Sequence, residues 1–251
     1  MTITARPLIR KTIALATLGL AAVAIFGAAF VSRGPGENSP SLPRMADAPV
    51  SLPGGRRLHV QKYEVTVAEW NACHAAGGCT LQLRARPGHT PQTLPATGLS
   101  YADVGEYLAW ITESTGRAYR LPTAAEWSYM ARDVLHDDPD PIYTDPSLAW
   151  ASSYLVEGNA PRALKASGSF STSAEGVADL DGSVWEWTSD CYAGGADEVG
   201  PDRCPAFYVG GEHVAVMSYL VRDPARGGCA VGSPPAHLGM RLVTDRRPPG
   251  A

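Results

Sequence analysis

The sequence feature that most constrains the fold is Trp185-Glu186-Trp187, a carboxylate between two indoles directly after an Asp181-Gly182 turn. This composition predicts a turn that leads into a short, bulky strand. Each indole removes about 150–250 Å² of surface from water when it is buried, so the pair strongly stabilises a fold. Glu186 must then be paired, coordinated or exposed, because an unpaired buried carboxylate costs too much free energy. The segment is therefore either a core anchor or part of a site.

The N-terminal part contains a nearly unbroken apolar run at residues 12–31. Its length of about twenty residues matches a helix that crosses the hydrocarbon core of a membrane. Basic residues precede the run, so we expect residues 1–11 to stay in the cytoplasm and the remainder to be exported. A cleaved signal peptide has a shorter apolar core, roughly 7–15 residues, and a small-residue cleavage site. Two alternatives stay open: an inner-membrane anchor that faces the periplasm, and a cleaved signal that leaves a periplasmic protein.

The next part, residues 32–55, is rich in Pro, Gly and Ser and is predicted to be a flexible linker. The folded domain is predicted at residues 56–245, followed by a tail at residues 246–251. The whole chain carries a formal charge of −4, and its first 33 residues hold four basic groups and no acidic ones, which leaves −8 on the rest. This acidic balance argues against nucleic-acid binding, which needs clustered Lys and Arg.

Five cysteines fit an oxidising compartment with two disulfides and one cysteine left over. Cys73 and Cys79 flank the flexible span HAAGG and could close a small loop. Cys191 and Cys204 bracket a loop rich in Gly, Asp and Pro and could hold its ends together. Cys229 is interpreted as a buried free thiol, since a reactive thiol needs an exposed, electropositive setting.

Three short helices are predicted, each from a capping residue that is followed three positions later by a carboxylate. The pairs are Thr66 with Glu69, Ser100 with Asp103, and Thr123 with Glu126. Gly77 and Gly116 are suited to end the first two helices. Strands are predicted in LHVQKYEVT at residues 58–66, at residues 213–221 and in HLGMRLVTD at residues 237–245. The many Gly and Pro residues indicate a turn-rich, irregular domain around these elements.

Four segments, taken in order, resemble the formylglycine-generating enzyme family, also called sulfatase-modifying factor domains. They are YEVTVAEW at 63–70, YRLPTAAEW at 119–127, DLDGSVWEWTSD at 179–190 and GG…LGMRLV at 210–243. The resemblance is strong because all four segments match in order and spacing. It covers about residues 57–245 and implies an irregular α+β fold of C-type-lectin-like topology.

The resemblance also implies a structural calcium site around the turn before the two indoles. Carried over to this sequence, Asp179 and Glu186 supply carboxylate oxygens, and Leu180 and Gly182 supply backbone carbonyls. Ca²⁺ accepts such hard oxygen ligands, six to eight of them. Ser183 stands where the family usually has Asn, which removes one supporting contact. The alternative is that Glu186 only forms hydrogen bonds with a loop backbone.

The oxidases of the family bind Cu(I) through two cysteines just after a GGS segment, since soft thiolates select Cu(I). In this sequence Gly210-Gly211 is followed by Glu212, and the two cysteine positions fall on Ala215 and Leu220. Neither residue is a thiolate ligand. We therefore expect neither copper binding by this pair nor formylglycine formation.

Other residues that could rebuild such a site are His213, Met217 and Cys229, together with Trp187, which lines the site in the oxidases. His213 and Met217 fall on one face if residues 213–221 form a strand. The alternative is that Met217 fills the core, His213 meets solvent and Trp187 only packs.

The short exported form, the C-x5-C after the first helix and the C-terminal segment RDPARGGCAVGSPPAHLGMRLV resemble the NirV-like branch of the family. That branch is associated with copper nitrite reductase in denitrifying bacteria. The resemblance implies a non-oxidase accessory protein with a protein partner such as an exported copper reductase. Two alternatives stay open: a metal-dependent oxidase with a rebuilt site, and a lectin-like binding domain, for which the fold alone is insufficient support.

Overall fold

The structure is a computed structural model, and it describes residues 42–135, 142, 163–193, 203–211, 214–223 and 237–246. The predicted membrane segment at residues 12–31, together with His213 and Cys229, lies outside these ranges. Among the described residues, none of the helices has the length and apolar character needed to span a bilayer. The chain divides into two units, residues 1–36 and 37–251, and every described residue belongs to the second unit.

Short helices and short strands alternate along the described chain. In order, they are β1 (Val50–Ser51), the 3-10 helix η1 (Pro53–Gly55), β2 (Arg57–Val60), α1 (Val67–Ala75), α2 (Tyr101–Thr115), α3 (Ala124–Ala131), β3 (Trp185–Tyr192), β4 (Ala206–Gly210), β5 (Ala215–Ser218), β6 (Leu238–Gly239) and β7 (Val243–Thr244). One sheet has the strand order β1-β2-β7, and the other has the order β5-β4-β3-β6. The pairing of β3 with β6 is parallel, and the other pairings of these strands are antiparallel. The mixed α+β class is confirmed.

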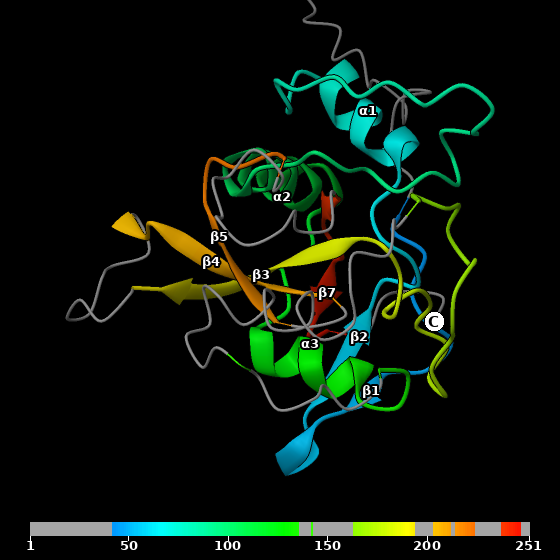
Figure 1. Cartoon of the computed structure of the whole chain (residues 1–251), viewed down its shortest axis with the longest axis vertical. Helices are drawn as coiled ribbons and strands as arrows, with labels where there is room; N and C mark the ends of the chain where they lie inside the picture. The colour runs from blue at the N-terminus through cyan, green and yellow to red at the C-terminus, as the bar shows by residue number, and fades with distance from the viewer. Residues whose placement is uncertain are drawn as a thin grey trace, which may run out of the picture. The chain divides into compact units, whose positions relative to one another are not determined.

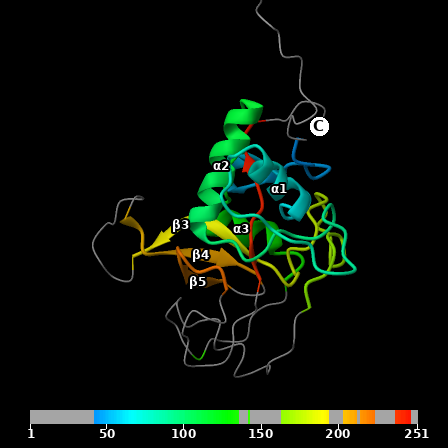
Figure 2. The same cartoon turned by 90° about the horizontal axis from the view of Figure 1, so that it is seen from above.

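All three predicted helices are present, and each begins with a complete capping box. In each box the cap hydroxyl accepts a hydrogen bond from the backbone N–H three positions later, and the carboxylate there accepts one from the cap N–H. Gly116 follows α2 with a φ of 64°, a left-handed conformation that ends a helix without steric cost. Helices α1 and α2 pack side by side (Figures 1 and 2), and Trp70 stacks on Tyr107 with ring centroids 5.3 Å apart.

The Trp-Glu-Trp segment begins β3, and Figure 1 shows α2 and α3 on opposite sides of the sheet that contains this strand. Successive side chains of a strand point to opposite faces. Trp185 and Trp187 therefore pack into the core shared with α1 and α2. Glu186 points the other way and meets Trp127 of α3. The predicted strand is confirmed, and it serves both as a core anchor and as the source of a buried carboxylate.

Two consecutive glycines at the end of β4 make room for two indoles. A Cβ added to Gly210 would lie 2.2 Å from the Trp127 ring, and one added to Gly211 would lie 2.3 Å from the Trp185 ring. Both distances are far below van der Waals contact, so only glycine fits at either position. The pair is thus required by packing alone, whatever chemistry follows it in the sequence.

The folded part begins earlier than the sequence pattern indicates. Residues 32–55 are predicted to be a linker, yet Val50–Ser51 pair with β2, and Met45 forms a bridge with Gln61. Val50 is 1% exposed, and Leu52 is 6% exposed. These apolar side chains bury surface in the core, and the Pro and Gly residues around them hide that signal in the sequence.

The strand predicted at residues 237–245 is two separate strands. Leu238–Gly239 pair with β3, whereas Val243–Thr244 pair with β2 in the other sheet. The backbone between them crosses from one sheet to the other and carries the buried Arg241. A single strand cannot serve two sheets, which is why the extended pattern is interrupted.

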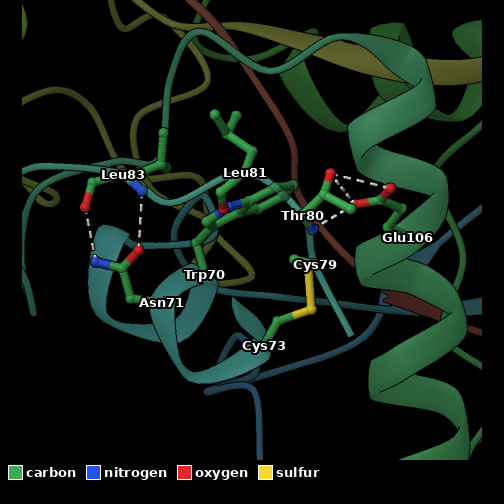
Figure 3. The surroundings of a disulfide bond; sticks show 8 residues. All are labelled: Trp70, Asn71, Cys73, Cys79, Thr80, Leu81, Leu83 and Glu106. Carbon is green, nitrogen blue, oxygen red and sulfur yellow. Dashed lines mark hydrogen bonds between the residues drawn. A yellow bond between two sulfur atoms is a disulfide. The ribbon is translucent and has the colours of Figure 1, made fainter. Parts of the chain in front are cut away.

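Both predicted disulfides are confirmed, one between Cys73 and Cys79 and one between Cys191 and Cys204. Figure 3 shows the surroundings of the first, which joins the end of α1 to the loop after it. The second joins the end of β3 to the residues just before β4.

The loop after α1 is fixed to two helices by side-chain hydrogen bonds to its backbone (Figure 3). The Trp70 indole N–H donates to the carbonyl oxygen of Leu81 at 2.8 Å. Asn71 both donates to and accepts from the backbone of Leu83, at 2.9 and 3.0 Å. Glu106 of α2 accepts hydrogen bonds from the same loop. These contacts hold α1 in a defined position.

Candidate functional site

The two positions that carry thiolates in the family's oxidases differ sharply in exposure. Ala215, at the start of β5, is 0% exposed, whereas Leu220, in the turn after β5, is 63% exposed. Cu(I) selects soft sulfur donors, and neither of these side chains has a lone pair to offer. The pair does not fit copper.

Trp187 is fully enclosed by the protein. Its indole N–H donates to the carbonyl oxygen of Leu99 at 2.8 Å, and the ring lies edge-on to Tyr101 with centroids 5.6 Å apart. The indole therefore has a partner for its one polar group and no open face for a substrate. In this chain Trp187 packs.

Met217 is also part of the core. It is 6% exposed in β5 and pairs in register with Phe207 of β4. This is the ordinary role of a flexible thioether, which fills irregular space between apolar side chains. The structure thus does not bring Met217 to an accessible site. His213 and Cys229 stay predictions, since both lie outside the described residues.

Arg241 is the charged centre between the two sheets. It is 0% exposed, and its Nε and Nη2 atoms bind the Glu186 carboxylate at 2.7–3.1 Å. Its Nη1 atom donates to the carbonyl oxygens of Gln61 and Lys62, and Nη2 also donates to that of Ala178. A guanidinium has five N–H groups, and these contacts use all of them.

The two predicted calcium carboxylates already hold protein donors. Glu186 accepts from Arg241 and, at 2.9 Å, from the Trp127 indole. Asp179 accepts from the backbone N–H groups of Gly168 and Phe170. The Arg241 guanidinium thus supplies the positive charge beside Glu186, and a Ca²⁺ ion, which needs six to eight oxygen ligands, would have to compete with these donors.

The other two residues predicted to bind calcium form the turn before β3. Gly182 donates its N–H to the carbonyl of Asp179, which has a φ of 66°, and Leu180 is 1% exposed. Within the described ranges, no group of three His, Cys, Asp or Glu residues is arranged to hold a metal ion. Calcium binding stays a prediction, and metal analysis of the purified chain is its direct test.

Glu64 is the third carboxylate near Arg241, and one of its two oxygens, Oε2, has no hydrogen-bond donor in the described part of the chain. It is 2% exposed, and its Oε2 atom lies 3.8 Å from Nη2 of Arg241 without accepting a hydrogen bond from any described residue. Burial raises the pKa of Glu64 to about 8; Arg241 opposes this increase, and the nearby carboxylates of Glu186 and Asp179 add to it. Three carboxylates therefore share one guanidinium.

A groove of about 460 Å³ opens beside Glu64. Its walls come from residues 42–44, residues 61–66, the first turns of α1, residues 92–93 and Ser167. Backbone hydrogen bonds of 2.7–3.0 Å join these walls: Lys62 to Arg44, Ala68 to Pro91, and Ser167 to Thr93. Walls held in this way form a site before any ligand arrives. Neither Glu64 nor this groove was predicted from the sequence.

Comparisons with known proteins point to one family. The sequence profile described as "Sulfatase-modifying factor enzyme 1-like domain" matches residues 22–246. One similar protein is inactive C-alpha-formylglycine-generating enzyme 2 of Mus musculus, 31% identical over 115 residues, which is 39% of this chain and 33% of that protein. Another is the formylglycine-generating enzyme of Mycobacterium tuberculosis, 26% identical over 197 residues, which is 64% of this chain and 58% of that one. The chain thus spans only about a third to just over half of these relatives.

Among solved structures, PvdO from Pseudomonas aeruginosa is similar with a TM-score of 0.48 and 21% sequence identity. The match covers 79% of this chain and 89% of PvdO.

Proposed function

Because this chain belongs to the sulfatase-modifying factor enzyme family, we propose that it is an exported member without the family's oxidase chemistry, acting as an accessory protein. The observation that carries this proposal is the pair Ala215 and Leu220 at the family's cysteine positions. Similar proteins in Mus musculus and Bos taurus are named as inactive formylglycine-generating enzymes, which supports the loss of catalysis within this family.

The scaffold around the lost site is intact, which supports a binding role for it. Glu186, Arg241 and Trp127 form a fully buried hydrogen-bonded unit that joins both sheets to α3. This unit fixes the positions of both sheets and α3 relative to one another, as a pre-formed binding surface requires.

The finer proposal is a NirV-like role, in which the partner is an exported copper reductase. Its support is the sequence resemblance at the C-x5-C segment and at the C-terminal segment that ends in LGMRLV. The predicted export signal or anchor at residues 12–31 would place the chain in the same compartment as such a reductase.

The loss of oxidase activity is tested with the full-length chain, Cu(I), O₂ and a cysteine peptide that carries the sulfatase recognition motif. Mass spectrometry should detect no formylglycine, while the Mycobacterium tuberculosis enzyme in parallel converts the same peptide. Turnover by this chain would overturn the proposal. Loss of that turnover in Cys229→Ser or His213→Ala would then favour the alternative of a rebuilt oxidase site.

The partner is tested by direct binding between the purified full-length chain and a purified copper nitrite reductase. Saturable binding that is unaffected by an excess of an unrelated acidic protein supports the finer proposal. No binding at micromolar concentrations, together with unchanged copper content of the reductase in cells that lack this chain, removes it and leaves only the coarser proposal.

A binding domain for a small ligand is a second candidate, favoured by the pre-formed groove beside Glu64. The groove would then be the binding site of the lectin-like alternative. The polar and charged side chains that line it restrict the class of ligand that it can bind.

A further inference from the structure

Three buried side-chain oxygens near the groove have no hydrogen-bond partner in the described part of the chain. They are Oε2 of Glu64, Oγ of Ser167 and Oγ of Ser183, and the Glu64 atom has only a longer ion-pair contact, 3.8 Å, with Nη2 of Arg241. All three residues line a small cavity of about 10 Å³, and Glu64 and Ser167 also line the groove. Leaving such a group unsatisfied destabilises the protein, and more so when the group is charged. The arrangement is therefore a polar site with unused hydrogen-bonding capacity on one carboxyl and two hydroxyl groups.

Three cations of the protein lie near this site, and none donates a hydrogen bond to Oε2 of Glu64. All five N–H groups of Arg241 are used by Glu186 and three backbone carbonyls. The Arg44 guanidinium lies over the Tyr63 ring, 5.6 Å from its centroid. The Lys165 side chain lines the same small cavity, and its ammonium lies 4.9 Å from the centroid of the Phe170 ring. An ammonium that donates to Oε2 of Glu64 would therefore add a hydrogen bond that none of these cations makes.

We propose that the groove binds a primary ammonium group, of a free alkylamine or of a lysine side chain, with N–H donors directed to Glu64 and Ser167. An ammonium carries three donors and no acceptor, which matches two oxygens that lack donors. It also supplies a positive charge beside Glu64, which favours the carboxylate form of this side chain when the ammonium is bound. Hydrogen bonds between charged groups are about twice as strong as neutral ones.

Part of the groove lining suits an alkyl chain. Leu42, Ala68 and Ala72 present apolar side chains along it. The raised pKa of Glu64 agrees with this assignment, because it shows how poorly the protein alone compensates a charge at that carboxylate. The predicted metal carboxylates are not needed, since Asp179 and Glu186 keep their own donors.

The test is calorimetric titration of the full-length chain with n-butylammonium, with butan-1-ol as the uncharged probe of similar size. We expect saturable binding of butylammonium and at least tenfold weaker binding of butan-1-ol. Equal binding of the two probes, or no binding of butylammonium, overturns the proposal.

Matched variants locate the binding. Glu64→Gln keeps the shape and removes the charge, and should weaken butylammonium binding at least tenfold. Ser167→Ala should weaken it about threefold. Glu106→Gln changes a carboxylate that binds the loop after α1 instead, so it should leave binding unchanged. Ala72→Trp fills the groove from the surface of α1 and should abolish binding. Unchanged binding in both Glu64→Gln and Ala72→Trp would overturn the proposal even if another variant failed to fold.

The source of the ammonium is read from two peptides that differ at one position, acetyl-Gly-Lys-Gly-amide and its norleucine counterpart. Tighter binding of the lysyl peptide than of butylammonium assigns the site to a lysine of a protein partner. Tighter binding of butylammonium assigns it to a small amine. This inference goes beyond the proposed function, and the titration reports nothing on formylglycine formation, so either proposal can fail alone.

Discussion

Two clusters of charged side chains involve the C-terminal segment, and they are balanced differently. The Arg241 cluster comprises Arg241, Glu64, Asp179 and Glu186; the Arg120 cluster comprises Arg120, Arg56, Glu126 and Asp245. The first is buried, with three carboxylates for one guanidinium. The second lies at the surface edge, with two of each charge.

This difference in charge balance indicates that the Arg120 cluster is a structural contact and that the Arg241 cluster is part of a candidate site. In the Arg120 cluster the charges cancel, and Arg120 binds both Glu126 and Asp245 at 2.7–3.1 Å, so the contacts join α3 to the residue after β7 and ask for nothing more. In the Arg241 cluster Glu186 is satisfied and Glu64 is not. A burial cost that the protein leaves uncompensated is the feature that marks a functional candidate.

The largest effect should come from Arg241→Met, which removes the only cation of the Arg241 cluster. Glu186 and three carbonyls would lose their donors, so the free energy of unfolding should fall by about 4 kcal/mol. Urea denaturation measures it. Arg120→Met is the matched control in the Arg120 cluster and should cost far less, because Arg120 and Asp245 are partly exposed and Arg56 still binds Glu126. Equal losses of unfolding free energy in the two variants would contradict the distinction between the Arg120 cluster and the Arg241 cluster.

Glu64→Gln should have the next largest effect, and it should stabilise. The pKa of Glu64 is about 8 in the folded protein and usually 4.5, so its contribution to stability is present below pH 4.5 and is lost as pH rises to about 8. The free energy of unfolding of the variant should therefore exceed that of the wild type by about 3 kcal/mol near pH 8. The groups that face Glu64 are Arg241, Glu186 and Asp179, and none of them changes. If the free energy of unfolding changed with pH in the same way in both proteins, the charge of Glu64 would already be compensated by the protein, which would contradict this prediction.

In the Arg120 cluster, Glu126→Gln should have a smaller effect, and it should lower the free energy of unfolding. Burial raises the pKa of Glu126, but Arg120, the Thr123 N–H and Arg56 together lower it to about 2. Its contribution to stability is present above pH 4.5 and is lost as pH falls to about 2. We expect a loss of about 2 kcal/mol, reduced by the solvent exposure of its arginine partners. Acid unfolding of Glu126→Gln against the wild type measures it, and identical acid curves would contradict the assignment.

What the sequence predicts well is local. The capping pairs such as Thr66 with Glu69 lie three residues apart, and the disulfide between Cys73 and Cys79 spans one short loop, so a few neighbouring residues specify each. The strand of the two indoles followed from composition in the same way. The family's cysteine positions were also found by short spacing from Gly210.

What the sequence does not reveal depends on distant pairing. Arg241 binds Glu186 and two carbonyls 179 and 180 positions away, and no local pattern specifies those partners. A weak signal was present, since Arg241 is a single charge inside an apolar run. Glu64 had one too: counting in twos from Leu58 and Val60 places it on their buried side. The groove beside it joins segments too far apart for any pattern to show.

The crossing of residues 238–244 from one sheet to the other sets the order in which the protein can be completed. Strand β3 pairs with β6, and β2 pairs with β7, which lies more than 180 positions later in the sequence. Contacts of such long sequence separation form late, because a large loop must close first. Both sheets remain incomplete until β6 and β7 of this segment pair with β3 and β2. The same segment carries Arg241, the ion-pair partner of Glu186. Completion of the sheets and neutralisation of the buried Glu186 charge are therefore coupled.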